Sequence, residues 1–245
     1  MKMRFLLAMI GTALALSGCG GGKVEGNQAS SAPVAAVAAP KGTNWSETVT
    51  ATKAGGFQMG NPDAPLKLIE YASFTCPHCR EFAETTDAGL RAKVDTGKVS
   101  FEFRNLIRDP LDLTAAILAR CGGTEPFFPL SRQLFGNQDS MFKTVQAAGD
   151  AAYKTAMQLP RDKSLIRLAE ISGLIEFVKA RGIAEPQART CLANVAEADK
   201  LAAESDTGAQ QYKVEGTPTI ILNEQKLDNA NSWPTLEAAL KAAGA

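Results

Sequence analysis

The sequence predicts an α/β fold in which a mixed sheet is interrupted by a long run of helices. Three observations predict it. Residues 66–104 follow a strand, helix, strand pattern, residues 111–190 follow a helical period, and the chain from residue 219 onward has a strand hairpin and a final helix. No internal repeat is present in the sequence.

The first unit opens with a strand over residues 66–72, which follows the turn signal of residues 61–65. Glu70 lies on the apolar face of this strand. Pro77 suits the first position of the helix that follows. Apolar and polar residues alternate over residues 99–104, so we expect a second strand with one solvated face.

Helical periodicity then dominates the middle of the chain, and Gly182 is placed to end one of its helices. We therefore divide the folded part into residues 44–110, a helical insertion over residues 111–190, and residues 191–245. In the last part we expect helices and strands over residues 195–212, 219–222, 225–227 and 234–243.

The N-terminal residues 1–18 have the pattern of an export signal. Lys2 and Arg4 precede an apolar stretch that is too short to span a membrane. Leu16-Ser17-Gly18-Cys19 resembles the bacterial lipoprotein signal, so we expect a lipidated Cys19 that anchors the protein to a membrane; an ordinary cleaved signal is the alternative. Residues 19–43 contain no aromatic residue, which predicts a flexible tether.

Charge and histidine content exclude several classes of function. The 26 Lys and Arg residues balance 26 Asp and Glu residues, so the chain lacks the positive excess that binds nucleic acid. His78 is the only histidine, which excludes a histidine-rich zinc site and any mechanism that needs two histidines. The sequence contains no motif for an organic cofactor, and we expect none.

Four cysteines remain once Cys19 is set aside, in a compartment where disulfides persist. The short spacing of Cys76 and Cys79 makes them the expected pair, which leaves Cys121 to pair with Cys191. A zinc site made of all four thiolates is the alternative, although such sites usually draw on two CxxC pairs.

The CxxC motif opens a helix, where unpaired N–H groups and the helix dipole stabilise a thiolate at Cys76. Pro77 has no N–H, but those of His78 and Cys79 remain, and the imidazole of His78 favours the thiolate further. We expect an oxidising pair in which Cys76, at an exposed helix start, is the attacking and leaving sulfur and the shielded Cys79 resolves the mixed disulfide. The alternative is a purely structural disulfide between Cys76 and Cys79. Such a bond would add little stability, because closing so short a loop constrains the unfolded chain little.

Glu70 is a candidate proton carrier because it lies just before the motif on the apolar face of its strand. Burial raises the pKa of such a carboxyl, which could then exchange a proton with Cys79, directly or through a water. The alternative is a strand-end acid that reaches solvent or pairs with a lysine.

The run LIEYASFTCPHC over residues 68–79 resembles the active-site strand and helix of the DsbA-like branch of the thioredoxin superfamily, and the Pro-His dipeptide between the cysteines is typical of DsbA. Further matches are Met59 to Pro65, Ala119-Arg120-Cys121, Cys191-Leu192 and Gly216-Thr217-Pro218-Thr219. The resemblance covers about residues 56–243 and implies a thioredoxin fold with a mixed central sheet and an inserted helical domain.

The resemblance also implies further site residues. It implies a cis bond before Pro218, which faces the cysteine pair beside a backbone that a substrate strand can join; a trans bond is the alternative from sequence alone. Thr217 stands where the best-known DsbA oxidases carry valine, and threonine also occurs in disulfide isomerases. Relative to the simplest members the Cys121–Cys191 pair is extra, and we expect it to be structural, with tuning of the redox potential as the alternative.

We expect an envelope thiol:disulfide oxidoreductase, anchored by lipid on the periplasmic side, that passes the Cys76–Cys79 disulfide to reduced exported proteins. The resemblance implies reoxidation by a quinone-linked membrane oxidase of DsbB type, and the absence of the isomerases' dimerisation domain implies a monomer. Two alternatives stay open: a reductase or isomerase kept reduced by a membrane electron donor, and a non-catalytic module that binds extended peptides beside Pro218.

Overall fold

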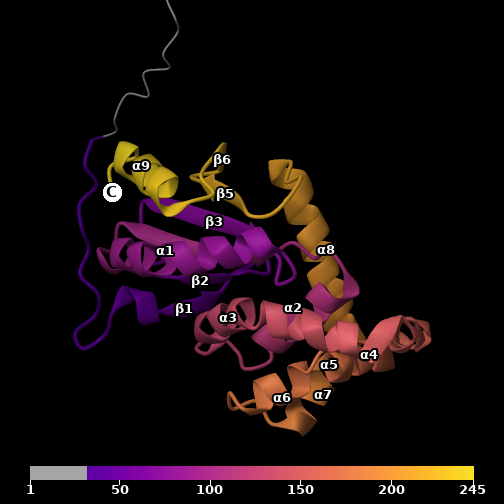
Figure 1. Cartoon of the computed structure of the whole chain (residues 1–245). Helices are drawn as coiled ribbons and strands as arrows, with labels where there is room; N and C mark the ends of the chain where they lie inside the picture. The colour runs from indigo at the N-terminus through magenta and orange to yellow at the C-terminus, as the bar shows by residue number, and fades with distance from the viewer. Residues whose placement is uncertain (1–31) are drawn as a thin grey trace, which may run out of the picture.

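The computed structural model describes residues 32–245, and Figure 1 shows a central sheet with a group of helices below it. The predicted signal peptide and the predicted lipidation at Cys19 lie outside the described residues. Within residues 32–245, no helix combines the length and apolar character that crossing a membrane requires.

The sheet has six strands in the order β1-β2-β4-β3-β5-β6. At its centre β3 (Leu66–Ala72) and β4 (Val99–Asn105) run parallel, and all other neighbouring pairs are antiparallel. The outer strands are β1 (Val49–Ala51), β2 (Phe57–Met59), β5 (Thr219–Leu222) and β6 (Gln225–Leu227). The predicted α/β fold with a mixed sheet is confirmed.

Strands β1 and β2, which follow a short 3-10 helix, η1 (Trp45–Glu47), were not predicted from the sequence. Each strand has only three residues, too few for an alternation of apolar and polar side chains to stand out. The turn between them contains Gly55 at a φ of 79°, a conformation that favours glycine.

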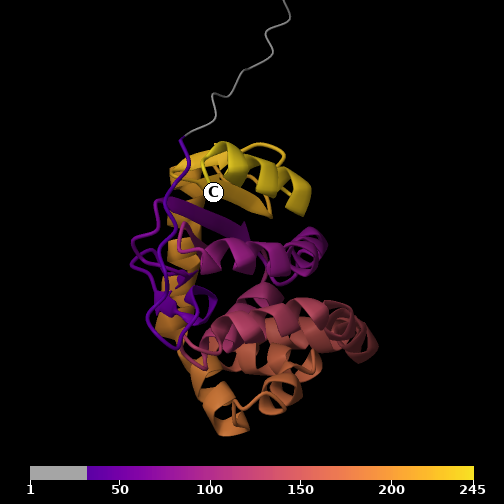
Figure 2. The ribbon, with the colours of Figure 1, turned by 90° about the vertical axis from the view of Figure 1, so that its left-hand side faces the viewer.

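Helices cover both faces of the sheet (Figure 2). One face carries α1 (Pro77–Asp95) and α9 (Trp233–Ala242), and the other carries α8 (Val195–Tyr212). The solvated face predicted for residues 99–104 is therefore wrong. Glu102 is only 8% exposed and pairs with Arg104, whose guanidinium donates to the hydroxyl of Tyr71 at 2.9 Å.

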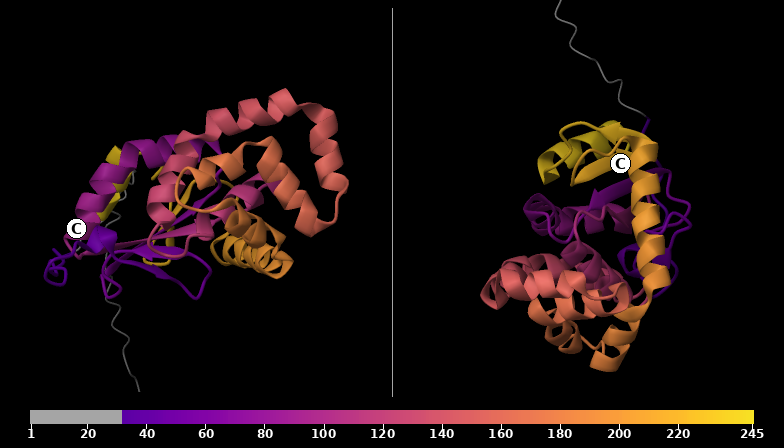
Figure 3. Two further views of the ribbon diagram at one scale, coloured as in Figure 1. Left: turned by 90° about the horizontal axis from the view of Figure 1, so that it is seen from below. Right: turned by 90° about the vertical axis from the view of Figure 1, so that its right-hand side faces the viewer.

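The insertion contains six helices: α2 (Pro110–Arg120), α3 (Phe127–Gly136), α4 (Gln138–Gln158), α5 (Arg161–Ile171), α6 (Leu174–Lys179) and α7 (Glu185–Ala193). The predicted limits at residues 111 and 190 both fall inside helices, α2 and α7 respectively. Figure 3 shows that α4 bends along its length; the bend is at Gly149, whose φ of 82° is not helical.

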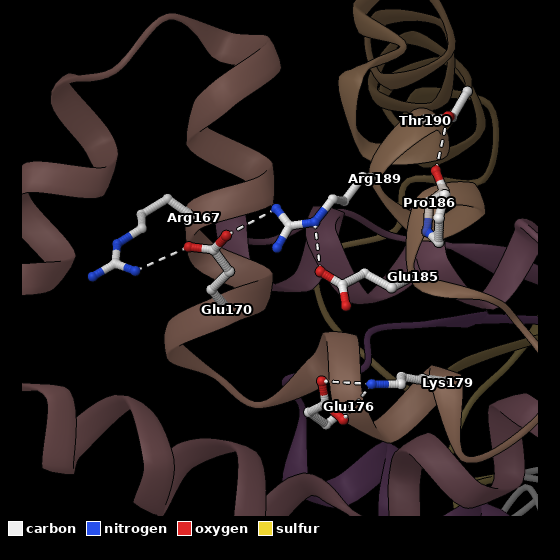
Figure 4. A network of polar contacts seen from close by, with 8 residues as sticks. All are labelled: Arg167, Glu170, Glu176, Lys179, Glu185, Pro186, Arg189 and Thr190. Atoms are coloured by element: carbon white, nitrogen blue, oxygen red, sulfur yellow. Dashed lines mark hydrogen bonds and ion pairs between the residues drawn. The ribbon is translucent and has the colours of Figure 1, made fainter.

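One ion pair joins α5 to α7 on their exposed sides, and a further pair within each helix adjoins it (Figure 4). The carboxylate of Glu170 accepts from Arg167 and from Arg189, both at 2.9 Å, and Arg189 also donates to Glu185 at 2.8 Å. Solvent screens these half-exposed pairs, so each adds little stability. The insertion is held mainly by its buried apolar side chains, which belong to the same core cluster as those of the sheet.

The segment before the sheet is not a free tether along its whole length. The N–H of Val34 donates to the carbonyl of Gly244 at 2.9 Å, and that of Val37 donates to Thr96 at 2.9 Å. The indole N–H of Trp45 donates back to the carbonyl of Val37 at 2.7 Å. The predicted flexible tether is therefore wrong at residues 34–37, because an extended backbone can bind the domain without supplying a core of its own.

Candidate active site

The two cysteines of the CxxC motif lie where strand β3 leads into helix α1. Pro77 is the first helical residue, Cys76 is the N-cap in an extended conformation, and Cys79 lies in the first turn. Both thiols are free, so the structure represents the dithiol form. Proline at this position starts the helix without losing an intrahelical hydrogen bond, which leaves the following N–H groups to face the sulfur.

The sulfur of Cys76 has the environment of a stabilised thiolate. The pKa of Cys76 is lowered from 9.0 to about 4, chiefly by a hydrogen bond from the thiol of Cys79. The side chain of Thr217 and the backbone N–H groups of Cys79 and His78 lower it further, while burial opposes them. In the protonated form, the Sγ of Cys76 donates to the carbonyl of Thr217 at 3.3 Å.

The helix start is less open than the sequence predicts. Pro77 and His78 are exposed, but Cys76 is only 3% exposed, because Thr217 and the start of α4 contact it. A surface depression of about 290 Å³ lies beside it, lined by His78, Glu81, Thr217, Pro218 and Asn231. The prediction of an exposed Cys76 is wrong, whereas Cys79, with no exposed surface, is shielded as expected.

Glu70 and Cys79 are both buried beneath Cys76, and both are driven toward their neutral forms. Burial raises the pKa of Glu70 from 4.5 to about 8, and the charge of Cys76 adds to the effect. Burial also raises the pKa of the Cys79 thiol, as do its hydrogen bond to Cys76 and the charge of Glu70. Glu70 is 3% exposed and its Oε1 has no hydrogen-bond partner, so it neither reaches solvent nor pairs with a lysine.

The loop before strand β5 closes the site from the other side. The Thr217–Pro218 peptide bond is cis, and Thr219 pairs with Tyr71 of β3 in the antiparallel β3–β5 ladder. This register carries Thr217 to the sulfur of Cys76 from a position 141 residues away in sequence. The structure thus brings together Cys76, Cys79, Glu70, Thr217 and Pro218.

Cys121 and Cys191 form a disulfide that joins the end of α2 to α7. This bond excludes the alternative of a zinc site made of four thiolates. The pair lies within the insertion and spans 70 residues of sequence.

The active-site loop is bound by three residues that were not among the predicted site residues: Asp109 just before the insertion, and Asp112 and Gln138 within it. Asp112 has no exposed surface and accepts the backbone N–H of Phe74 at 2.8 Å. Asp109 accepts the hydroxyl of Thr75 at 2.7 Å. Gln138 is 1% exposed and donates to the carbonyls of Phe74 at 2.8 Å and Cys76 at 3.1 Å.

Part of this arrangement leaves a signal in the sequence. Asp109 followed by Pro110 is a typical helix start, and the carboxylate of Asp109 does cap α2 by accepting the N–H of Asp112 at 2.8 Å. Gln138 leaves no such signal, because its partners are 62 and 64 residues away in sequence.

Comparison with known proteins places this site among redox proteins. The profile of the family described as thioredoxin matches residues 52–242. The crystal structure of a protein-disulfide isomerase from Novosphingobium aromaticivorans is similar, with a TM-score of 0.71 and 32% identity, covering 76% of this chain and 95% of that one. Wolbachia pipientis alpha-DsbA1 shares the fold, with a TM-score of 0.60 and 20% identity over 75% of this chain and 87% of that one.

Among curated sequences, a Rickettsia bellii protein provisionally named a protein-disulfide oxidoreductase is 26% identical over 172 residues. The match covers 70% of this chain and 58% of that protein. A second such protein, from Rickettsia typhi, is 29% identical over 70% of this chain and 56% of its own length. The chain thus spans less than three fifths of these curated relatives.

Proposed function

The chain belongs to the thioredoxin family, and from this premise we propose that it is a thiol:disulfide oxidoreductase that donates its Cys76–Cys79 disulfide to reduced exported proteins. One observation carries the proposal: the two thiols of one CxxC motif have opposite environments, a stabilised thiolate at Cys76 and a buried neutral thiol at Cys79. Such a pair favours the reduced form, so its disulfide is readily given away.

The size of this preference follows from the pKa of Cys76. An ordinary thiol with a pKa of 9.0 is protonated at pH 7. The reduced protein is therefore stabilised at pH 7 only by the difference between this pH and the pKa of Cys76, which is about 4. Three pH units correspond to about 4 kcal/mol, or about 90 mV for a two-electron couple. All else equal, the pair is more oxidising by this amount than one with an ordinary thiol.

The reaction proceeds in two exchanges. A substrate thiolate attacks the Sγ of Cys76 in the disulfide, and Cys79 leaves, taking a proton from the carboxyl of Glu70. A second substrate thiolate then attacks the substrate sulfur of the mixed disulfide, and Cys76 leaves as a stabilised thiolate. The two substrate thiolates have lost two electrons, which the enzyme holds as the Cys76 thiolate and the Cys79 thiol. The proton on Cys79 came from Glu70, which is left as a carboxylate until Cys79 returns the proton on reoxidation.

The residues around the cysteine pair have different roles. The backbone N–H of His78, and the thiol and N–H of Cys79, hold negative charge on Cys76. Thr217 contacts the same sulfur, and Pro218 with its neighbours lines the depression in which an extended substrate segment would lie. The disulfide between Cys121 and Cys191 serves the insertion as a structural link.

We also propose the cellular setting that the sequence predicts. The export signal, with lipid attached at Cys19, would hold a monomeric enzyme at the membrane on the periplasmic side. There it would be reoxidised by a quinone-linked oxidase of DsbB type.

Disulfide isomerisation is the second candidate, and two observations favour it. Thr217 precedes the cis-proline, a position where threonine also occurs in disulfide isomerases and in other DsbA-like branches, and the similar Novosphingobium protein is named an isomerase. An isomerase or reductase would be held as the dithiol in the cell by a membrane electron donor, so alkylation of cell extracts at acid pH separates it from an oxidase. An oxidase is expected mainly as the disulfide.

Catalysed oxidation of a reduced test protein by the oxidised mature chain tests the function. Cys76→Ala is expected to abolish catalysis, and Cys79→Ser to accumulate a mixed disulfide with the test protein, because the resolving thiol is gone. A peptide-binding module would behave otherwise, with no catalysis by the parent chain and unchanged peptide binding in Cys76→Ala. Accumulation in Cys76→Ser in place of Cys79→Ser would reverse the roles of the two sulfurs.

A further inference from the structure

The turn of residues 73–75 joins β3 to α1 and places Cys76 at the start of the helix. Inside the turn, the carbonyl of Ser73 accepts the N–H of Cys76 at 3.1 Å, and the hydroxyl oxygen of Ser73 accepts the N–H of Thr75 at 3.2 Å. The N–H of Phe74 bonds instead to the carboxylate of Asp112, on α2, at 2.8 Å. A side chain of α2 therefore holds the backbone of the turn that carries Cys76.

The carboxylate of Asp112 binds two loops at once. Its Oδ1 accepts the N–H of Phe74, and its Oδ2 accepts the N–H of Arg108, between β4 and α2, at 3.0 Å. Asp112 has no exposed surface. A buried carboxylate is unfavourable unless donors compensate the lost hydration, and here each oxygen has its own backbone donor. The charge and the positions of the two loops thus depend on each other.

Asp109, at the N-cap of α2, adds a second contact to the same turn. Its Oδ2 accepts the hydroxyl of Thr75 at 2.7 Å, and its Oδ1 accepts the N–H of Asp112 at 2.8 Å. Hydrogen bonds to an ionised acceptor are roughly twice as strong as those between neutral groups. The two acids thus hold the two residues directly before Cys76.

These contacts act differently on the two redox states of the cysteine pair. In the disulfide form, the covalent bond to Cys79 fixes Cys76 whatever the turn does. In the dithiol form, Cys76 stays against the N–H groups of His78 and Cys79, which stabilise its thiolate, only as far as the turn holds it there. Loosening the turn should therefore destabilise the reduced form more than the oxidised form.

We propose that Asp112, together with Asp109, is a positioning residue of the redox site: its carboxylate fixes the turn before Cys76 and thereby makes the Cys76–Cys79 disulfide more oxidising. This inference rests on the proposed function and adds that part of the oxidising strength comes from α2. Asp112 gives up no electron and no proton in the reaction, and it acts through the turn alone.

The charge of Asp112 sets the strength of its contacts. Burial raises the pKa of Asp112 to about 7, and the charge of Asp109 adds to this, while the hydroxyl of Ser73 and the N–H groups of the two loops oppose it. Asp109 in turn raises the pKa of Tyr153, on α4, which stays neutral below pH 9. The contacts of Asp112 should therefore be complete at pH 8 and weaker at pH 5.5.

The reduction potential of Cys76–Cys79 in Asp112→Asn tests the proposal, with the mature chain equilibrated in glutathione buffers at pH 8. Asparagine keeps the shape but has one accepting oxygen, so one of the two N–H groups loses its partner. We expect the equilibrium constant for reduction by glutathione to fall about tenfold, which lowers the potential by about 30 mV. At pH 5.5 the difference from the parent chain should shrink, because Asp112 of the parent is then neutral.

Thr75→Val is a milder second variant, because it removes only the hydroxyl bonded to Asp109 and keeps the shape of the side chain. We expect the same equilibrium constant to fall by about threefold at pH 8. If Asp112→Asn fails to fold, this variant decides the test: an unchanged or higher potential in Thr75→Val overturns the proposal.

Asp95→Asn is the matched control, because Asp95 also accepts a backbone N–H and a hydroxyl from one distant residue, Ser46, at 2.7 and 3.1 Å. It lies at the other end of α1 and should leave the potential unchanged. A shift as large as that of Asp112→Asn would mean that general destabilisation lowers the potential, which overturns the proposal. So would a loss of unfolding free energy in Asp112→Asn with no shift in its potential.

The same measurement separates this inference from the proposed function. A parent potential in the range of a disulfide donor that Asp112→Asn leaves unchanged overturns the positioning role and leaves the function standing. A parent potential near that of thioredoxin, with the tenfold change in Asp112→Asn, supports the positioning role and contradicts the donor function.

Discussion

Two ionisable groups of the site, Cys76 and Glu70, have pKa values displaced in opposite directions. Hydrogen bonds from Cys79, Thr217 and the helix start lower the pKa of Cys76 to about 4, and burial without a partner raises that of Glu70 to about 8. The thiolate is therefore present at neutral pH where it must leave, and the carboxyl is protonated where it must donate.

The pKa of Cys76 depends chiefly on the hydrogen bond from Cys79. We expect Cys76 of the reduced chain to titrate near pH 4. The absorbance of the thiolate and the rate of alkylation measure this titration. Cys79→Ala removes the largest cause and should raise this pKa toward, without reaching, 9.0. A parent chain that titrates near 9.0 would contradict the assignment of Cys76 as a stabilised thiolate.

Glu70 should make stability fall with rising pH. Its pKa is higher in the folded chain, so the folded state favours the protonated form, and this contribution is complete below 4.5 and lost as pH rises through about 8. Relative to Glu70→Gln, the oxidised parent chain should lose unfolding free energy over this interval, by less than the about 5 kcal/mol that the full shift represents, because the disulfide removes the charge of Cys76 and leaves burial as the cause.

Urea unfolding at pH values between 4.5 and 9 measures this difference. Glu81→Gln, at an exposed position of α1, serves as the control and should keep the pH dependence of the parent chain. A Glu70→Gln variant whose stability follows the same pH curve as the parent would show that Glu70 titrates as an exposed acid does.

At the scale of elements, the insertion does more than cover the sheet, because α2 and α4 fix the loop that carries Cys76. The side chains of Asp112 and Gln138 bind the N–H and the carbonyl of Phe74. Such contacts between distant elements leave no periodic pattern, whereas the strand over residues 66–72 and the helix over 195–212 could be predicted because their signals are local.

The other errors at this scale have equally physical causes. The prediction of a solvated face on β4 is wrong because α8, about 90 residues later in the chain, packs on that face. The prediction of an exposed Cys76 is wrong because Thr217 and Gln138 contact it and cover it. In both cases the local sequence is consistent with exposure, and a distant segment changes the outcome.

Gln138→Ala tests the link between the insertion and the loop. It leaves the carbonyls of Phe74 and Cys76 without their donor in a buried place, which should cost about 1–3 kcal/mol of unfolding free energy. Gln210→Ala, at an exposed position on α8, is the control and should cost far less. Equal losses in chemical denaturation would mean that Gln138 contributes only its share of helix packing.

At the scale of the whole molecule, the Cys121–Cys191 disulfide restrains a loop of 70 residues that contains most of the insertion. Cross-linking a loop of this length lowers the entropy of the unfolded chain, so replacing both cysteines by serine should cost about 2–4 kcal/mol. The reduction potential of Cys76–Cys79 should shift by less than about 30 mV. A larger shift, with little loss of stability, would make the second disulfide a regulator of the first.

The sequence predicts the general layout of the molecule well, because the CxxC motif, the strand before it and the Gly216-Thr217-Pro218 segment are each short and local. The burial of Glu70 could be predicted from the apolar face of its strand, but a small cavity beside it could not, since that cavity forms only where α3 of the insertion lies across α1. The prediction of a flexible tether is wrong at residues 34 and 37 for a similar reason, because their N–H groups form hydrogen bonds with carbonyls at the ends of α9 and α1.

The reduction potential of the Cys76–Cys79 pair tests the central claim most directly. The mature chain is equilibrated across glutathione buffers at pH 7 and read by thiol labelling and mass, with Cys121 and Cys191 followed separately. A donor of disulfides should give a value in or above the roughly −180 to −120 mV range of disulfide isomerase and DsbA. A value near that of thioredoxin, roughly −270 mV, would mean that the protein removes disulfides and would contradict the account.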